Sequence, residues 1–508
     1  MLARVSSAAV IGIDAHMVDV EVDLSNGLPS FSIVGLPDNA VKESKERVKA
    51  ALKNSGYGFP ARRVTVNLAP ADIKKEGTGF DLAVAVGLVR AQEIVERDDL
   101  DDYVFVGELS LDGSVRAVRG ALSVAMGAAQ AGKKLVVPGD NAAEAALVDG
   151  VEVYGVSSLA DLVETLAGRT EAAPVRVDAA AMFGGGRGEG PDFSDVKGQE
   201  HVKRALEVAA AGGHNVLMIG PPGSGKTMLA RRFASILPPM TLDEAVEATR
   251  VHSVAGALPA DRPLVTARPF RSPHHTISDA GLIGGGQVPR PGEVSLAHKG
   301  VLFLDEMPEF RKNVLEVLRQ PMEDGRVTIA RAALAVTYPA EFILVGAMNP
   351  CPCGFLGDPA RECRCTPLQV ARYRARLSGP LLDRIDIHCD VPRVRFRELA
   401  ASRAGEGSAA VRERVEAARR VQARRFRGGR QATNGRMGSR ETERHCRVDD
   451  RCRRLLESAV ERLGLSARAY TRVLKVARTI ADLDGADEIA PPHIAEAIQY
   501  RTLDKPLA

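Results

Sequence analysis

A glycine-rich loop that ends in a lysine and a threonine is the stretch of this sequence with the most specific chemistry. It follows the apolar run 215–219, which is typical of a buried strand, and precedes a helix-forming run at 228–234. In this context glycines let the backbone turn tightly and direct N–H groups at phosphate oxygens, and the helix N-terminus adds partial positive charge. The pattern predicts an ATP-binding loop made of Gly220, Pro221, Pro222, Gly223, Ser224, Gly225, Lys226 and Thr227.

Two residues of this loop have separate predicted roles. Lys226 supplies a cation for the β- and γ-phosphates, and the Thr227 hydroxyl is placed to bind Mg²⁺. The alternative is a glycine-rich loop formed by chance. Chance does not explain why an apolar strand precedes the loop and a helix follows it.

Two carboxylates follow a second apolar run. Residues 301–304 predict a buried strand, and Asp305 and Glu306 come directly after it. Ligands of open α/β sheets bind beyond the carboxyl ends of the strands. We therefore expect Asp305 to hold the Mg²⁺ through water and Glu306 to act as the base that polarises the attacking water. Such a motif alone is weak evidence, since many strands end in acids, but 79 residues after Lys226 and in the same predicted sheet it becomes strong evidence.

Four cysteines lie close together, as Cys351, Cys353, Cys363 and Cys365. Four thiolates can close a tetrahedral Zn²⁺ site, although a spacing of one residue within each pair is tighter than usual. The alternative is a set of reduced thiols. The other cysteines, at 389, 446 and 452, form no fourfold set.

Two further segments lie within the predicted ATPase region. Residues 270–276 contain the pair His274-His275, which has no third metal ligand nearby in sequence, so we predict a loop role. Residues 325–337 have the pattern of a β-hairpin. Arg326 and Arg331 on this hairpin could contact nucleic-acid phosphates.

The elements that position these residues belong to a long, multi-domain chain. It has 508 residues, 45% of them hydrophobic, and a formal net charge of +3, so it is not basic as a whole. No run of about 20 apolar residues is present, and the N-terminus has no long apolar stretch, so we expect no membrane span and a cytoplasmic protein. Arginines are dense between 412 and 453. They predict either a surface for anionic partners or a solvated helix face and loop.

Periodicity divides the chain into four parts. Residues 1–168 mix strands (18–24, 63–68 and 135–138) with helices (39–54 and 80–95), which indicates an α+β domain. Residues 169–190 are rich in Ala and Gly without a period, as in a flexible linker. The ATPase core spans 191–395, and an arginine-rich helical part spans 396–508, with helices at 455–463, 471–483 and 491–499.

With these motifs in place, the chain resembles the ComM/YifB-type Mg-chelatase-like AAA+ ATPases over nearly its full length. The resemblance implies an α/β fold: a P-loop AAA+ module with a helical lid, preceded by a Lon-protease-like α+β domain. Residues 75–81 and 107–120 resemble two Lon segments. However, the nucleophile position falls near Gly79 or Phe80 and the lysine position near Leu122, so the domain lacks the proteolytic dyad.

The resemblance implies roles for three more residues. Asn349, after the apolar run 342–348, matches the sensor-1 position; the alternative is an Asn that caps a turn. Arg384 matches an arginine finger that would reach the nucleotide of a neighbouring subunit, which implies a ring, in this family a homo-hexamer. Arg468 matches the sensor-2 position at the start of a lid helix. For both arginines the alternative is an ordinary surface residue.

Three functions stay open. The first is a DNA motor for branch migration or helicase action during recombination of incoming DNA, as the resemblance implies. The second is a motor subunit for metal insertion into a porphyrin. The third is an ATPase that remodels a protein partner; ATP-dependent proteolysis is disfavoured because the dyad is missing.

Overall fold

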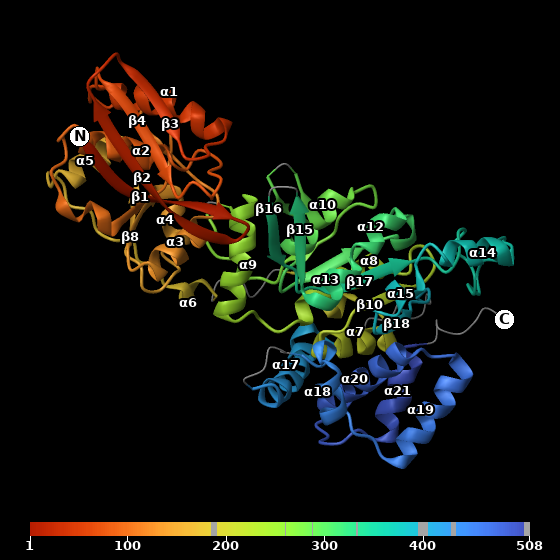
Figure 1. Ribbon diagram of the computed structural model, residues 1–508. Helices are drawn as coiled ribbons and strands as arrows, with labels where there is room; N and C mark the ends of the chain where they lie inside the picture. Colours follow the sequence, from red (N-terminus) through yellow and green to blue (C-terminus); the bar gives the residue numbers. More distant parts are fainter. Residues whose placement is uncertain are drawn as a thin grey trace.

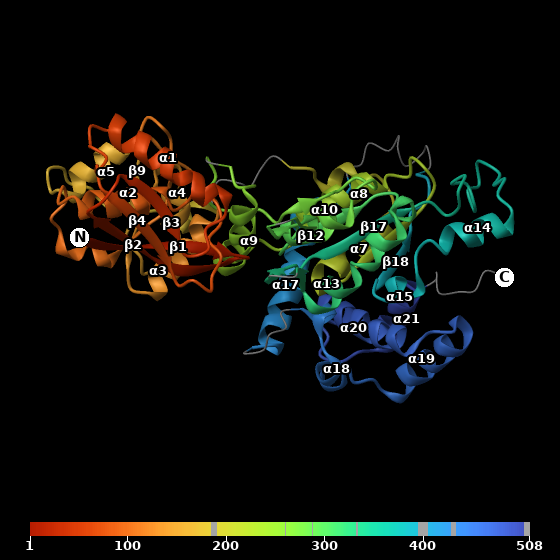
Figure 2. The same cartoon turned by 45° about the horizontal axis from the view of Figure 1, so that its top comes forward.

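The molecule is elongated. The computed structural model describes residues 1–183, 190–259, 261–286, 288–331, 334–394, 405–427 and 433–501. Figure 1 shows an N-terminal body of strands and helices, a second sheet with its helices in the middle, and a group of C-terminal helices below it. In Figure 2, helix α9 (Leu242–Ala255) lies between the N-terminal body and the second sheet.

The N-terminal body is built on a mixed sheet. Val18, Val20 and Val22 are buried and alternate with half-buried acidic residues, as the period-two pattern at 18–24 predicted. In sheet order the strands are β3 (Ser30–Val34), β4 (Arg63–Ala69), β2 (Asp14–Ser25), β1 (Leu2–Ile11), β5 (Tyr103–Phe105), β8 (Lys134–Pro138) and β9 (Val153–Val156). A separate small ribbon pairs β6 (Glu108–Leu109) with β7 (Val115–Arg116).

Helices of the N-terminal body bury their apolar faces against this sheet. The helix predicted at 39–54 is confirmed, and the Asp38 side chain caps it by accepting from the Val41 N–H. The helix predicted at 80–95 ends four residues earlier than expected, at Ala91. The helices of this body are α1 (Asn39–Asn54), α2 (Asp81–Ala91), α3 (Ala121–Gln130), α4 (Gly139–Ala145) and α5 (Leu159–Leu166).

The second sheet is parallel throughout, and its core strands are buried. Parallel sheets carry cover on both faces, which explains why the strand sequences are continuous apolar runs. In sheet order the strands are β11 (Phe270–Arg271), β14 (Val301–Leu304), β17 (Ile343–Met348), β10 (Val216–Ile219) and β18 (Ile387–Asp390). β17 lies between β10 and β14, so the residues that follow these three strands share one edge of the sheet.

Two groups of helices surround the second sheet. Those of the middle part are α7 (Glu200–Gly212), α8 (Lys226–Phe233), α9, α10 (Asp279–Ile283), α11 (Glu293–Leu296), α12 (Lys312–Glu316), α13 (Arg319–Asp324), α14 (Pro367–Arg374) and α15 (Gly379–Leu382). The C-terminal group is α17 (Ser408–Arg425), α18 (Ser439–His445), α19 (Asp450–Leu463), α20 (Ala467–Leu483) and α21 (Pro491–Gln499). One continuous core joins the C-terminal group to the sheet through α7. The three predicted C-terminal helices are present, two of them longer than expected.

The predicted hairpin is confirmed, and the N-terminal body touches it. β15 (Arg326–Arg331) pairs antiparallel with β16 (Leu334–Pro339). The turn between β1 and β2 lies so close that a Cβ added at Gly12 would be 2.5 Å from Val336 Cγ1. Arg250 of α9 fastens the same turn by donating to the Ile13 carbonyl at 2.7 Å. Another small ribbon pairs β12 (Gly284–Gly285) with β13 (Arg290–Pro291).

Part of the predicted linker is ordered. Helix α6 (Ala179–Met182) lies within 169–190, and Val177, Met182 and Phe183 pack against a small apolar cluster. The glycine run 184–189 and the expected boundary at 395/396 lie outside the described residues. Within the ranges that are described, no helix has both the length and the apolar character needed to cross a bilayer.

Candidate nucleotide site and cysteine cluster

The predicted phosphate loop connects β10 to α8, whose first residue is Lys226. Gly223 and Gly225 have φ angles of +76° and +93°, which residues with a Cβ rarely adopt. Here glycine is required, because the loop must reverse direction within a few residues. The local sequence therefore produces the expected concave loop at a helix N-terminus.

Lys226 is tied to three groups at the carboxyl edge of the sheet. Its Nζ donates to the carbonyl oxygens of Gly220 at 2.7 Å and Pro221 at 3.0 Å, and to Asn349 Oδ1 at 3.2 Å. Burial lowers the pKa of Lys226, an effect that the nearby carboxylates Asp305 and Glu306 oppose. Anionic phosphate at this position would favour the charged ammonium in the same way.

Thr227 and Asp305 come together although 78 residues separate them. The Thr227 hydroxyl donates to Asp305 Oδ2 at 2.7 Å, and the Glu306 N–H donates to Asp305 Oδ1 at 2.9 Å. A hydroxyl and a carboxylate are the hard oxygen ligands that Mg²⁺ prefers. The buried Ser224 Oγ, in the same loop, has no hydrogen-bond partner among the described residues. The oxygen atoms of Thr227, Asp305 and Ser224 therefore fit a magnesium–nucleotide complex.

Glu306 is held in an unusual conformation at the end of β14. Its φ angle is +49°, in the left-handed region, and its side chain is 59% exposed. A non-glycine residue in this region is strained and persists only where the surrounding structure holds it. Such residues are found most often at functional sites. The exposed carboxylate is free of the core and open to water, as a general base requires.

His275 is a neighbour of Glu306 that sequence reasoning missed. Its Nδ1 lies 3.8 Å from Glu306 Oε2, and its ring is tilted by 34° against that of His274, with centroids 4.1 Å apart. The histidines follow β11, which runs parallel beside β14, so their segment reaches the same edge of the sheet. The sequence predicted only a loop role for this pair. In the structure, the loop places His275 beside the candidate base Glu306. The strand that places the histidines, Phe270–Arg271, is two residues long and only half apolar, so the sequence contains no recognisable strand signal there.

Gln199 is a second residue that the sequence did not single out. Its Nε2 donates to the carbonyl oxygens of Ser224 and Pro392, both at 2.9 Å, and so joins the phosphate loop to the segment after β18. Its backbone is left-handed, with φ of +58°, and its buried Oε1 has no partner in the described ranges.

Arg384 and Arg468 do not join this cluster. The Arg384 side chain is 6% exposed and forms an ion pair with Glu323 of α13 at 2.6 Å. Arg468 is exposed in the first turn of α20. The two segments meet each other, since Ser466 Oγ donates to Asp383 Oδ1 at 3.4 Å.

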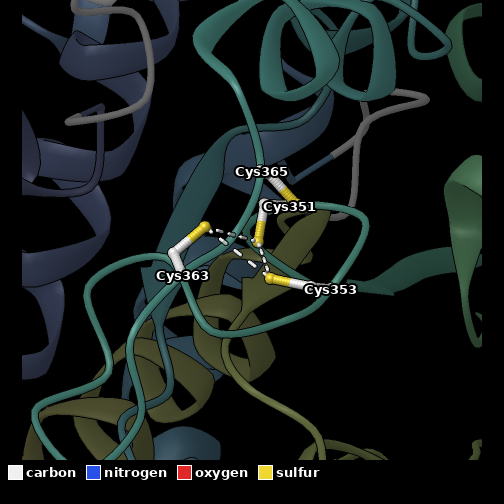
Figure 3. Close-up of side chains that lie close together, drawn as sticks. All are labelled: Cys351, Cys353, Cys363 and Cys365. Carbon is white, nitrogen blue, oxygen red and sulfur yellow. Dashed lines mark hydrogen bonds between the residues drawn. The ribbon is translucent and has the colours of Figure 1, made fainter.

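The four cysteines converge into one cluster, shown in Figure 3. Cys351 Sγ lies 3.4 Å from Cys353 Sγ and 3.7 Å from Cys363 Sγ, and all four sulfurs lie within 4.8 Å of one another. A tetrahedron with Zn–S bonds of about 2.3 Å has edges of about 3.8 Å. Backbone N–H groups of Phe355 and Arg364 lower the pKa of Cys353 to about 6. The spacing therefore fits four thiolates around one ion.

Two arginines of the arginine-rich segment pair inside the molecule, whereas Arg420 and Arg424 of α17 and Arg427 just after it are exposed, so both sequence interpretations stay open. Arg419 donates to the Ala210 carbonyl at 2.8 Å, and Arg425 forms a buried ion pair with Asp482 at 2.6 Å. These two side chains join α17 to α7 and α20. By contrast, Arg326 and Arg331 of the β15–β16 hairpin are exposed.

The parallel sheet and the residues at its edge define an AAA+-type module of the Mg-chelatase class within a mixed α/β chain. The family model "Magnesium chelatase, subunit ChlI" matches residues 192–399. "Subunit ChlI of Mg-chelatase" matches 20–141, and "Magnesium chelatase, subunit ChlI C-terminal" matches 405–501.

Similarity to individual proteins narrows the family. The chain is 45% identical to "Uncharacterized protein YifB" of Salmonella typhimurium and 45% identical to "Competence protein ComM" of Haemophilus influenzae. Each alignment covers 507 residues, 99% of this chain and 98% of the relative. It is 29% identical over 177 residues to "Magnesium-chelatase 38 kDa subunit" of Cereibacter sphaeroides, which covers 31% of this chain and 52% of the relative. The chain belongs to the ComM/YifB family of Mg-chelatase-like proteins.

Proposed function

We propose that this protein hydrolyses ATP. The observation that carries the proposal is the hydrogen-bonded group of Lys226, Asn349, Thr227 and Asp305 at one edge of the parallel sheet. Lys226 binds the phosphates, Asn349 orients the attacking water or senses the γ-phosphate, and Glu306 accepts a proton from that water. Gly223, Gly225 and the first residues of α8 supply backbone N–H groups for the phosphates, since Pro221 and Pro222 have none.

Magnesium belongs to the same proposal. Thr227 and Asp305 would hold the ion, Asp305 through water, and Mg²⁺ would neutralise charge on the phosphates. A second ion, Zn²⁺, would occupy the cluster of Cys351, Cys353, Cys363 and Cys365.

We further propose a homo-hexameric ring in the cytoplasm. AAA+ proteins of the Mg-chelatase type commonly oligomerise, and a ring would allow Arg384 of one subunit to complete the site of the next. The domain boundaries proposed from the sequence keep 1–168 as a Lon-like scaffold, 191–395 as the ATPase core and 396–508 as a lid that carries Arg468. In the scaffold, the positions of the proteolytic dyad hold Gly79 or Phe80 and Leu122, and the last two are buried apolar side chains.

The substrate that we propose is DNA, with branch migration or helicase action during recombination of incoming DNA. The name of the Haemophilus relative, a competence protein, supports this, as do the exposed side chains of Arg326 and Arg331 on the hairpin. The direct test is ATPase activity with and without forked or Holliday-type DNA. Stimulation by branched DNA and displacement of its strands would support the proposal, and an ATPase indifferent to every DNA form would overturn it.

Metal insertion into a porphyrin is the second candidate. The similarity to the Mg-chelatase subunit favours it, but that similarity covers 31% of the chain, whereas the competence protein matches throughout. A host that makes no chlorophyll-type pigment would exclude it. An ATPase that remodels a protein partner is the outcome that remains if neither DNA nor porphyrin affects turnover.

Changing Arg326 and Arg331 together to Gln is expected to weaken DNA binding and to flatten its dependence on salt. Each phosphate contact contributes about −0.9 to the log–log slope of affinity against salt on duplex DNA, so losing two contacts per chain should be measurable. DNA-independent ATPase should not change, because the hairpin lies outside the nucleotide cluster. Fluorescence titration of forked DNA at several salt concentrations measures the slope.

The matched control is Arg62→Gln with Arg63→Gln, two exposed arginines in the N-terminal body. This pair should leave the slope unchanged. If the hairpin variant binds and remodels forked DNA with the wild-type salt dependence, the hairpin is not part of the DNA interface.

A further inference from the structure

The cysteine cluster is attached directly to the candidate nucleotide site. Cys351 follows Asn349 by two residues, and Asn349 Oδ1 accepts from Lys226 Nζ at 3.2 Å. Gly354 lies against the phosphate loop itself, since a Cβ added there would be 2.6 Å from Pro222 Cδ. Its φ of +85° and its N–H bond to the Cys351 carbonyl, at 3.0 Å, close a tight turn around the first cysteine pair. Any shift of this turn therefore moves Pro222 or Asn349.

The second cysteine pair reaches the same residues by another route. Cys363 and Cys365 lie just before α14, which begins after its N-cap, Thr366. At the end of α14, the buried Tyr373 hydrogen-bonds to the backbone of Asn349, and Arg374 Nε donates to the Pro350 carbonyl at 3.4 Å. Both ends of the cysteine loop are therefore linked to the segment around Asn349, one through the backbone before Cys351 and the other through α14.

Besides the sulfurs, this loop is held mainly by local hydrogen bonds, such as those of the Asp358 N–H to the Phe355 carbonyl at 3.1 Å and of the Ala360 N–H to Asp358 Oδ1 at 2.8 Å. Between the two pairs most side chains are exposed, and α14 projects at the end of the molecule away from the N-terminal body (Figures 1 and 2). The one ring contact within the loop is that of Arg361 with Phe355, 5.1 Å from the ring centroid. Four neutral thiols in contact add little stability. An ion bound by them contributes its binding free energy to the folded loop.

We propose that a thiophilic divalent ion, of the zinc class, binds the four cysteines and by doing so positions Asn349 and the phosphate loop for ATP hydrolysis. The inference rests on the proposed ATPase. Soft thiolate ligands select such ions over Mg²⁺, so this site is chemically distinct from the one at Thr227 and Asp305. The ion does not take part in the reaction. It fixes the loop that carries Asn349, and small displacements of positioning groups cost large factors in rate.

The test compares two cysteine variants of the full-length protein. In Cys363→Ser/Cys365→Ser the second pair is lost; in Cys446→Ala, the control, a buried cysteine of the C-terminal helices is changed. Elemental analysis should find about one zinc per chain in the wild type and the control and none in the double variant. The kcat for ATP should fall on the order of ten- to hundredfold in the double variant, with a smaller change in KM and in the Kd of a fluorescent ATP analogue.

Reversibility separates this role from general misfolding. Stripping the wild type with a mercurial thiol reagent and a chelator should lower kcat, and Zn²⁺ with a thiol reductant should restore it, whereas Mg²⁺ alone should not. Adding Asn349→Ala to the double cysteine variant should lower kcat little further, because both changes act through one group.

Three results would overturn the inference: metal-replete protein without bound metal, metal-free protein with the wild-type kcat, or fully additive losses in the combined variant. A wild type that holds zinc and binds the ATP analogue but turns over no ATP would instead overturn the proposed ATPase.

Discussion

Glu306→Gln is expected to bind ATP normally and to hydrolyse it about 10²–10⁴ times more slowly than the wild type. Glutamine has nearly the same size but cannot accept a proton from water. The side chain is 59% exposed, so the change should leave the fold intact. Phosphate release measures turnover, and titration with a fluorescent ATP analogue measures binding.

Two comparisons make this result specific. Lys226→Ala should lose tight ATP binding itself, because its ammonium neutralises phosphate charge before any reaction occurs. Glu309→Gln makes the same chemical change three residues further on, at a partly exposed acid paired with Arg376, and should leave turnover unchanged. Wild-type hydrolysis by Glu306→Gln would mean that the base is another group.

The strands and loops of the nucleotide site were predictable because their sequence signals lie within short segments of the chain. A strand buried on both faces is a continuous apolar run, and a phosphate loop needs glycines at fixed positions. The runs before Gly220, Asp305 and Asn349 were therefore recognisable without any knowledge of the sheet. The convergence of four cysteines also followed from their spacing.

Strand order and long-range pairing were not predictable in this way. Nothing local shows that β11 pairs with β14, and only that pairing brings His275 to Glu306. The internal pairing of Arg425 in α17 was not predictable for the same reason. The partner of Arg425 is Asp482, 57 residues away, so composition could not distinguish an internal ion pair from a surface for anions.

Arg384→Ala is expected to reduce ATP turnover by about 10³–10⁵ if its guanidinium completes the site of a neighbouring subunit. Within one chain the side chain is buried against Glu323 and donates to the Pro380 carbonyl at 2.6 Å, so a finger would have to leave this ion pair when the ring forms. Turnover per chain should then rise with protein concentration, because an isolated subunit lacks the finger.

A companion change distinguishes a finger from a structural arginine. If Arg384 only stabilises the segment after α15, then Glu323→Gln, which removes the same ion pair from the other side, should lower turnover and melting temperature about as much as Arg384→Ala does. If Arg384 is a finger, Glu323→Gln should keep most of the activity, since the arginine remains and is released more easily.

Mixed rings give the decisive measurement. Arg384→Ala subunits added in excess to wild type should lower turnover more than dilution does, because each altered subunit disables a site formed with a normal neighbour. An altered subunit that still binds ATP should also leave its own nucleotide pocket competent. Each of the two variants alone should be inactive. When Glu306→Gln and Arg384→Ala subunits are mixed, activity should return at sites where the intact Arg384 of a Glu306→Gln chain reaches the intact Glu306 site of an Arg384→Ala chain. Activity from two inactive variants would require that the finger acts between subunits, and its absence, with mixed rings shown to form, would place Arg384 in its own chain.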